Sequence, residues 1–166
     1  MHTTKQRGFT LIELVVVIII LGILAVVAAP KFINLKSDAL IASLKGLQGA
    51  LKSANTLVYS KAVLAGQEKL EPGSVTVNGT TISTTVGYIS VPAENVAKAL
   101  DGSFEVMTDP TDTITADWGL FFPNNSTSMN IYPKGYTPSD NCNLRYSVDS
   151  NVPSEPALYS LTTTGC

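Results

Sequence analysis

The chain has 166 residues, of which 45% are apolar and 14% charged. This length and composition are sufficient for one domain with a hydrophobic core, and they exclude a wholly disordered protein. The formal net charge of −2 gives no basic field that would hold phosphates, so nucleic acid is a poor partner for this chain.

The first predicted element is a long apolar helix near the N-terminus. Leu14–Ala29 has no polar side chain, and extending the run back to Phe9 adds only Thr10 and Glu13. At about 1.5 Å per residue, a helix over residues 9–29 covers roughly 30 Å, which is the thickness of the hydrocarbon core of a bilayer. The run can therefore span a membrane.

The flanking charges predict the orientation of this span. Lys5 and Arg7 precede the run, so the positive-inside rule places the N-terminus in the cytoplasm and the chain after Pro30 outside it. Both cysteines, Cys142 and Cys166, then lie in an oxidising compartment.

A cleavable secretory signal is the ordinary interpretation of a basic start and an apolar run. The run is longer than a usual signal core, and its only small-residue site, residues 27–29, is followed by Pro30. A signal anchor is the better plain alternative. Against both stands Glu13, because a carboxylate at the bilayer centre costs about 2.5 to 3.5 kcal/mol and needs compensation.

Residues 8–14, with the sequence GFTLIEL, resemble the class III signal of bacterial type IV prepilins and type II secretion pseudopilins. The resemblance implies a prepilin peptidase and methyltransferase that cuts after Gly8 and methylates Phe9. The eight-residue leader and the phenylalanine are similar to the type IVa class. The implied organisation is a cleaved leader (1–8), a transmembrane and filament-core helix (9–30) and a periplasmic-to-extracellular head (31–166).

Three further residues have roles in this interpretation. Cleavage creates a cationic amine on Phe9, which can meet Glu13 of a neighbouring subunit and fix the register of a helical homopolymer. Gly22 and Pro30 are weak points of the helix. They predict either a bend or local melting that lets a filament stretch, or a simple kink at the end of the span, and the sequence does not separate the two.

After Pro30 an apolar stripe continues at helical spacing, which predicts one kinked helix over residues 9–65 whose outer half packs on the head. We interpret the stripe as core packing and place Lys45, Gln48, Lys52 and Asn55 on other faces. The members of the stripe are Ile33, Leu40, Leu44, Leu47, Leu51, Ala54 and Val58.

From Glu71 onward, short alternating runs predict an antiparallel sheet. Asn78-Gly79 predicts a hairpin turn between strands 75–77 and 80–82, and Pro92–Leu100 predicts a short helix closed by Gly102. The other expected strands are residues 104–107, 117–122, 129–132, 143–148 and 157–162. The fold class is therefore α+β, and it resembles the type IV pilin fold.

Cys142 and Cys166 are the only cysteines, and both lie in a loop-rich C-terminal region, so we predict that they form a disulfide. The resemblance implies the same pairing, since pilins close a C-terminal surface loop in this way. Residues 29–32 and the end of the chain, 162–166, look most like the mannose-sensitive haemagglutinin (MSHA) pilin branch.

Enzymatic constellations are missing from the sequence. His2, the one histidine, lies in the leader, which excludes catalytic pairs that need His. We expect no enzyme activity, cofactor or metal. Asp109, Asp112 and Asp117 lack the spacing of an EF-hand and suit a turn better than calcium.

Two surface features have a plain and a functional interpretation. Asn78, Asn124 and Asn125 begin glycosylation sequons, although each also suits a turn, and we prefer the turn. Tyr132, Tyr136 and Tyr146 are plausible exposed contact residues, although packing in a strand explains them equally well.

The sequence thus predicts a subunit of a type IV, MSHA-like pilus (fimbrium) used for adhesion. The resemblance implies residence in the inner membrane before assembly, an assembly platform with an ATPase motor, and a host or environmental surface as the final partner. The alternatives are a type II secretion pseudopilin and, in a different class, a signal-anchored periplasmic binding domain.

Overall fold

The computed structural model describes residues 8–123, 127–149 and 156–166, without the side chains of residues 30 and 32–34. The chain forms two compact units, Met1–Ala39 and Leu40–Cys166, and helix α1 (Leu11–Leu64) runs through both. In the first unit, the backbone of α1 stays helical through Gly22 and Pro30. The long helix expected over residues 9–65 is confirmed.

The C-terminal end of α1 is closed by two backbone hydrogen bonds around a left-handed glycine. Gly66 has a φ of +65°, Gln67 donates its N–H to the carbonyl of Ala62 at 2.7 Å, and Gly66 donates to Val63 at 3.1 Å. This is the Schellman arrangement, in which glycine avoids the steric cost of a Cβ at positive φ.

The second unit contains a three-stranded antiparallel sheet in the order β1-β2-β3. Its strands are β1 (Gly73–Val77), β2 (Thr80–Thr85) and β3 (Tyr88–Ile89). Asn78 (φ 49°) and Gly79 (φ 81°) form the turn between β1 and β2, as predicted. The sequence analysis missed β3 because a two-residue strand shows no alternation.

Helix α2 (Ala93–Ala99) matches the helix predicted from Pro92, but its end differs from the prediction. Leu100 is the C-cap with an extended backbone, and Gly102 does not adopt a positive φ, so Gly102 does not close the helix. Instead, a Cβ at Gly102 would lie 2.9 Å from the ring of Phe104, which gives the glycine a packing role.

A five-stranded sheet in the order β4-β5-β6-β7-β8 completes the head. The five strands predicted for this region are confirmed within one residue at each end, and every pairing is antiparallel except that of β4 with β5, which is parallel. A short 3₁₀ helix, η1 (Pro138–Asp140), precedes β7. The strands are β4 (Phe104–Met107), β5 (Trp118–Phe121), β6 (Ser128–Pro133), β7 (Asn143–Ser147) and β8 (Leu158–Thr162).

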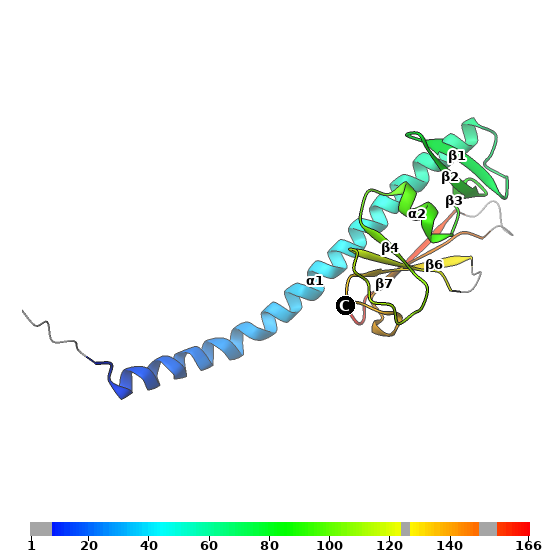
Figure 1. Cartoon of the computed structure of the whole chain (residues 1–166). Helices are drawn as coiled ribbons and strands as arrows, with labels where there is room; N and C mark the ends of the chain where they lie inside the picture. Colours follow the sequence, from blue (N-terminus) through cyan, green and yellow to red (C-terminus); the bar gives the residue numbers. More distant parts are fainter. Residues whose placement is uncertain (1–7, 124–126, 150–155) are drawn as a thin grey trace, which may run out of the picture. The chain divides into compact units, whose positions relative to one another are not determined.

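Both sheets lie along the same side of the C-terminal half of α1 (Figure 1). The predicted stripe of α1 is largely confirmed, because Leu44, Leu47, Leu51 and Val58 are buried in one core with residues of both sheets. The stripe packs as core, and its apolar side chains remove a large surface from water.

Asn55 corrects the predicted helix faces. It is not on an outer face but is 2% exposed in the core. Its side-chain oxygen accepts a hydrogen bond from the N–H of Ile89 at 2.9 Å, and its amide nitrogen donates to the hydroxyl of Tyr159 at 2.7 Å. Tyr146 donates its hydroxyl proton to the carbonyl of Ile89 at 2.6 Å. The polar side chain is buried because it links α1 to one strand of each sheet, β3 and β8.

Candidate functional site: the N-terminal apolar helix

Gly8 and Phe9 lie just before α1 and are exposed, Phe9 with 85% of its surface accessible. A Cβ placed on Gly8 would meet nothing within 4 Å. The described part of the chain therefore gives no steric reason for glycine at this position.

Thr10 and Glu13 form a capping box at the start of α1. Glu13 Oε2 accepts hydrogen bonds from the backbone N–H and from the hydroxyl of Thr10, both at 2.8 Å, while the N–H of Glu13 donates to Thr10 Oγ1 at 3.3 Å. Such a box satisfies backbone donors that have no partner in the first turn of a helix. The sequence analysis missed Thr10, although Thr-x-x-Glu before an apolar run is the sequence signature of this cap.

The cap uses only one oxygen of Glu13. Glu13 Oε1 makes no hydrogen bond within the described residues, and the side chain is exposed. One half of the carboxylate is thus open to a group from outside the chain.

Apart from Glu13, the N-terminal turns of α1 carry apolar side chains on all sides. Leu11–Ala29 is a segment of 19 residues with a mean hydropathy of 3.2, and none of it is buried within the chain. By length and composition it is able to cross a membrane. Soluble monomers rarely expose a contiguous apolar surface of this extent, so the segment suits contact with lipid or with other apolar helices.

Gly22 and Pro30 both lie within the backbone of α1. A Cβ on Gly22 would meet nothing within 4 Å, and Pro30 is part of the continuous helix. The predicted bend or local melting at these residues remains a prediction.

The C-terminal disulfide is confirmed between Cys142 and Cys166, whose Cα atoms are 4.9 Å apart. Cys142 is fully buried in the core. Gly165 donates its N–H to the carbonyl of Asn141 at 3.2 Å, and a Cβ on Gly165 would overlap the carbonyl oxygen of Asp140. The end of the chain is therefore held against the loop before β7.

The acidic loop after β4 is held together by hydrogen bonds within the loop. Asp112 Oδ2 accepts the backbone N–H groups of Thr108 and Asp109 at 2.8 and 2.9 Å, and these bonds lower the pKa of the Asp112 carboxyl. Hydrogen bonds from Thr111 likewise lower the pKa of Asp109. The arrangement supports the turn interpretation of these aspartates.

The other surface predictions have mixed outcomes. Asn78 lies in the β1–β2 turn, whereas Asn124 and Asn125 lie outside the described residues. The interpretation of the tyrosines as exposed contacts is wrong for two of them: Tyr146 is fully buried and Tyr132 is 3% exposed, because both point into cores of the head. Tyr136 is half-buried and donates its hydroxyl proton to the carbonyl of Cys166 at 3.5 Å.

The fold and the apolar helix define a class of protein. Its members combine an α+β domain with a long helix whose N-terminal part is exposed, apolar and long enough to span a membrane. Comparisons with known proteins agree with this class. Residues 3–29 match the family model of the prokaryotic N-terminal methylation motif. No solved structure matches the chain significantly.

Among curated relatives, the type IV major fimbrial protein FimA of Dichelobacter nodosus is 30% identical over 119 residues, which cover 69% of this chain and 72% of the relative. The type IV narrow pilus major component PilA5 of Thermus thermophilus is 40% identical over 58 residues, 35% of this chain and 50% of the relative. The type II secretion system core protein G of Klebsiella pneumoniae is 45% identical over 51 residues, 28% of this chain and 36% of the relative.

The chain belongs to the type IV pilin family. The match to FimA extends over more than two thirds of both proteins, which a shared N-terminal motif alone would not give. The chain nevertheless spans only about half the length of other curated relatives that it matches.

Proposed function

We propose that this chain is the precursor of a structural subunit of a type IV pilus. The observation that carries the proposal is the exposed apolar segment Leu11–Ala29, which begins directly after the Gly8–Phe9 pair within the methylation motif. Such a segment suits two environments in turn: the inner membrane before assembly, and a bundle of identical helices in the filament afterwards.

Processing is the first step of the proposed function. A prepilin peptidase and methyltransferase removes residues 1–8 and methylates the new N-terminus at Phe9. The exposure of Gly8 and Phe9, and the lack of any internal reason for a glycine at position 8, support recognition of this segment by an enzyme. Residues 9–30 then form the membrane and filament-core helix, and residues 31–166 the head.

In our proposal, assembly uses two charged groups of the processed chain, the new N-terminal amine and the Glu13 carboxylate. The amine of Phe9 is cationic, and Glu13 has one oxygen that its cap does not use. We expect the amine of one subunit to bind the Glu13 carboxylate of its neighbour. At about 4 Å and an effective dielectric constant near 20 the attraction is roughly 4 kcal/mol before desolvation is subtracted, so the pair sets register more than it adds stability.

The energy for assembly has to come from outside the filament. Moving an apolar helix from lipid into a bundle of apolar helices changes its hydrophobic burial little. An inner-membrane assembly platform with an ATPase motor supplies this work in our proposal.

Gly22 and Pro30 are the points where the helix deforms, because glycine costs about 1 kcal/mol relative to alanine and proline lacks a backbone N–H.

The finer assignment is an MSHA-like pilus that attaches cells to host or environmental surfaces. Residues 29–32 and 162–166 favour this branch, and the disulfide holds the C-terminal region in a defined surface loop. The filament is extracellular in this assignment, and the chain acts as a structural protein without cofactors.

A second candidate is a pseudopilin of type II secretion, which the 45% identity to the core protein G favours. Both candidates share processing at Gly8, so only the product distinguishes them. A pilin forms long surface fibres that contain this chain, whereas a pseudopilin does not. A signal-anchored periplasmic binding domain, the alternative of another class, keeps its N-terminus.

The test is mass spectrometry of the surface protein together with electron microscopy of sheared fibres. We expect a mature chain that begins at Phe9 with one methyl group, and fibres that react with antibody against the head. Gly8→Ser should block removal of the leader, with Gly22→Ser as a control that is processed normally. A wild-type surface protein that retains Met1 would refute the proposal.

A further inference from the structure

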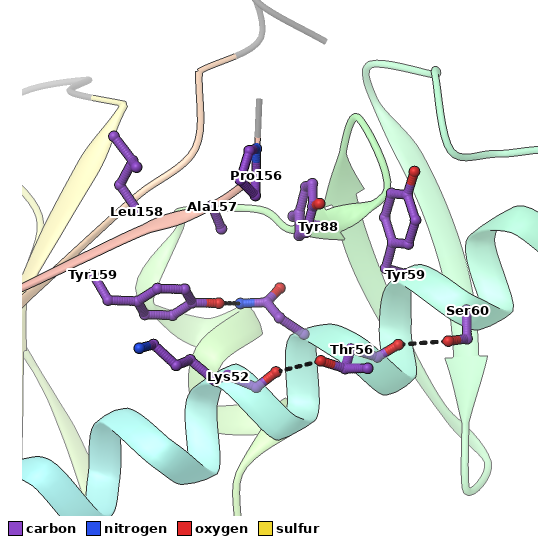
Figure 2. Close-up of a pocket in the computed structure, with 10 residues that line it drawn as sticks. Lys52, Thr56, Tyr59, Ser60, Tyr88, Pro156, Ala157, Leu158 and Tyr159 are labelled. Atoms are coloured by element: carbon purple, nitrogen blue, oxygen red, sulfur yellow. Dashed lines mark hydrogen bonds between the residues drawn. The ribbon is translucent and has the colours of Figure 1, made fainter. Parts of the chain in front are cut away.

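An open cleft in the second unit lies between α1, β3 and the start of β8. Its volume is about 540 Å³, within the range of small-molecule sites. Figure 2 shows that Lys52, Thr56, Tyr59 and Ser60 of α1 border it along one side. The opposite side consists of Tyr88, Pro156, Ala157, Leu158 and Tyr159.

Aromatic rings line both ends of this cleft. Tyr59 and Tyr88 form a stacked pair at one end, with ring centroids 4.9 Å apart, and Tyr159 lies at the other end (Figure 2). All three are half-buried, so part of each ring stays accessible. An accessible tyrosine ring offers an apolar face, against which the axial C–H groups of a sugar ring can pack.

Polar groups surround the rings at defined positions. The hydroxyls of Thr56 and Ser60 donate to backbone carbonyls of α1 at 2.9 and 2.7 Å, which leaves their oxygens as acceptors. The hydroxyls of Tyr59 and Tyr88 make no hydrogen bond within the described part of the chain and can donate or accept. A ligand with several hydroxyl groups satisfies this set.

Lys52 adds a positive charge to the cleft. Its Nζ lies 5.4 Å from the ring centroid of Tyr159, which favours a position of the ammonium at the end of the cleft. Among the described residues, Lys52 has no ionic partner and no carboxylate lines the cleft. An anionic group on the ligand would complement this charge.

We propose that this cleft binds an acidic saccharide, with a uronate ring against the tyrosines and its carboxylate on Lys52. The inference deepens the adhesive role proposed above and rests on it for its biological setting. It names the chemical class of the surface polymer that the subunit recognises, and residues 156–159 of the cleft belong to the segment that the Cys142–Cys166 disulfide closes.

The experiment uses the full-length chain in detergent micelles, so that its outcome does not depend on filament formation. Tyrosine rings are labelled with carbon-13 and assigned with single Tyr→Phe variants. The probes are digalacturonic acid, its neutral counterpart galactobiose, and acetate as a bare carboxylate. Ligand-observed saturation transfer and shifts of the tyrosine ring signals report binding.

We expect digalacturonic acid to shift the signals of Tyr59, Tyr88 and Tyr159, and galactobiose to bind more weakly. Lys52→Met should weaken digalacturonic acid binding about fivefold, to the level of galactobiose, because one exposed charge pair contributes at most about 1 kcal/mol. Lys45→Met is the matched control, since Lys45 is an exposed lysine of the same helix outside the cleft.

Three results would overturn the proposal. The first is that acetate produces the same shifts as digalacturonic acid, which would reduce the site to a nonspecific anion contact. The second is that Lys45→Met and Lys52→Met weaken binding equally. The third is that neither sugar shifts the ring signals, which would leave the cleft without a saccharide ligand. In each case the filament could still form, so the proposed pilus function is tested separately.

Discussion

Asn55 links three elements of the head by side-chain hydrogen bonds. Its amide accepts from Ile89 and donates to Tyr159 and Tyr146, at 2.9, 2.7 and 3.2 Å. Since no backbone ladder joins β3 to β8, this side chain connects the edges of the two sheets.

Replacing Asn55 with alanine should destabilise the head by about 2 to 4 kcal/mol, because it leaves the N–H of Ile89 buried without a partner and opens a cavity. Chemical denaturation monitored by circular dichroism measures the loss. Thr56→Ala, at the exposed neighbouring position, is the control and should change stability by less than about 0.5 kcal/mol. A neutral Asn55→Ala would show that water replaces the amide.

The stability of the head should depend on pH in the alkaline range because of Tyr159. Burial raises the pKa of its hydroxyl from 10.0 to about 12. In the unfolded chain the proton is lost above the ordinary pKa, while the folded chain still holds it. The stabilisation is therefore complete below about pH 10 and is lost as the pH rises toward about 12.

The measurement is the urea midpoint at several pH values for the wild type and for Tyr159→Phe. Both lose stability above about pH 10 because burial also raises the pKa of Tyr146, but the slope should be shallower in the variant. Parallel curves would mean that Tyr159 titrates alike in the folded and unfolded chains.

At the scale of single residues, the sequence could not place Asn55. Its position in the helix is adjacent to the apolar stripe, but an asparagine is usually exposed. Its burial is favourable because of partners that are distant in the sequence, the N–H of Ile89 and the hydroxyls of Tyr146 and Tyr159. The same contacts explain why Tyr146 is buried, which decides between the two interpretations that its sequence left open. Local patterns do not reveal long-range polar pairs.

At the scale of elements, the C-terminal loop depends on the disulfide. On the chain-entropy model, closing a loop with a sequence separation of 24 contributes roughly 3.5 kcal/mol. Cys166→Ser removes the bond at a half-buried position and avoids placing a hydroxyl at the fully buried Cys142.

We expect Cys166→Ser to lower the midpoint of thermal unfolding of the head and to leave membrane insertion unchanged, because α1 contains neither cysteine. Differential scanning calorimetry and membrane flotation measure the two effects. Reduction of the wild type should produce the same fall in midpoint. Equal midpoints for the oxidised wild type and the variant would contradict this prediction.

The sequence predicted most elements because their signals are local. The Asn78-Gly79 turn requires positive φ, and alternating runs gave the strands of the larger sheet. The parallel pairing of β4 with β5 was not predictable in this way, since alternation marks a strand but not the direction of its partner. The capping box could have been predicted from the spacing of Thr10 and Glu13. Only Glu13 was singled out, because a carboxylate in an apolar run is costly.

At the scale of the whole molecule, the Glu13 carboxylate has two roles to distinguish, one within its own chain and one between subunits. One is local, because Glu13 accepts hydrogen bonds from Thr10 and closes the first turn of α1. The other is the proposed charge pair with the Phe9 amine of a neighbouring subunit. In the proposed function, assembly of the filament depends on this charge pair and not on the cap.

Two substitutions distinguish these uses. Glu13→Gln keeps an oxygen that can accept from Thr10 but removes the charge, whereas Thr10→Ala removes the cap hydroxyl at a cost of about 1 kcal/mol and keeps the charge. If the charge pair sets register, Glu13→Gln chains should be inserted and processed but remain in the inner membrane, while Thr10→Ala chains form fibres. Electron microscopy of sheared fibres and immunoblots of membrane fractions measure the outcome.

Mixed expression adds a control, because each junction needs an amine and a carboxylate from different chains. Wild-type subunits should therefore carry some Glu13→Gln subunits into fibres, which epitope tags on the head would reveal. Regular fibres made only of Glu13→Gln chains, with Thr10→Ala chains unassembled, would assign Glu13 to the helix cap. Another residue would then have to set the register of these helices, since their Val, Ile and Leu side chains are interchangeable. Gly22 would be the first position to substitute in a search for it.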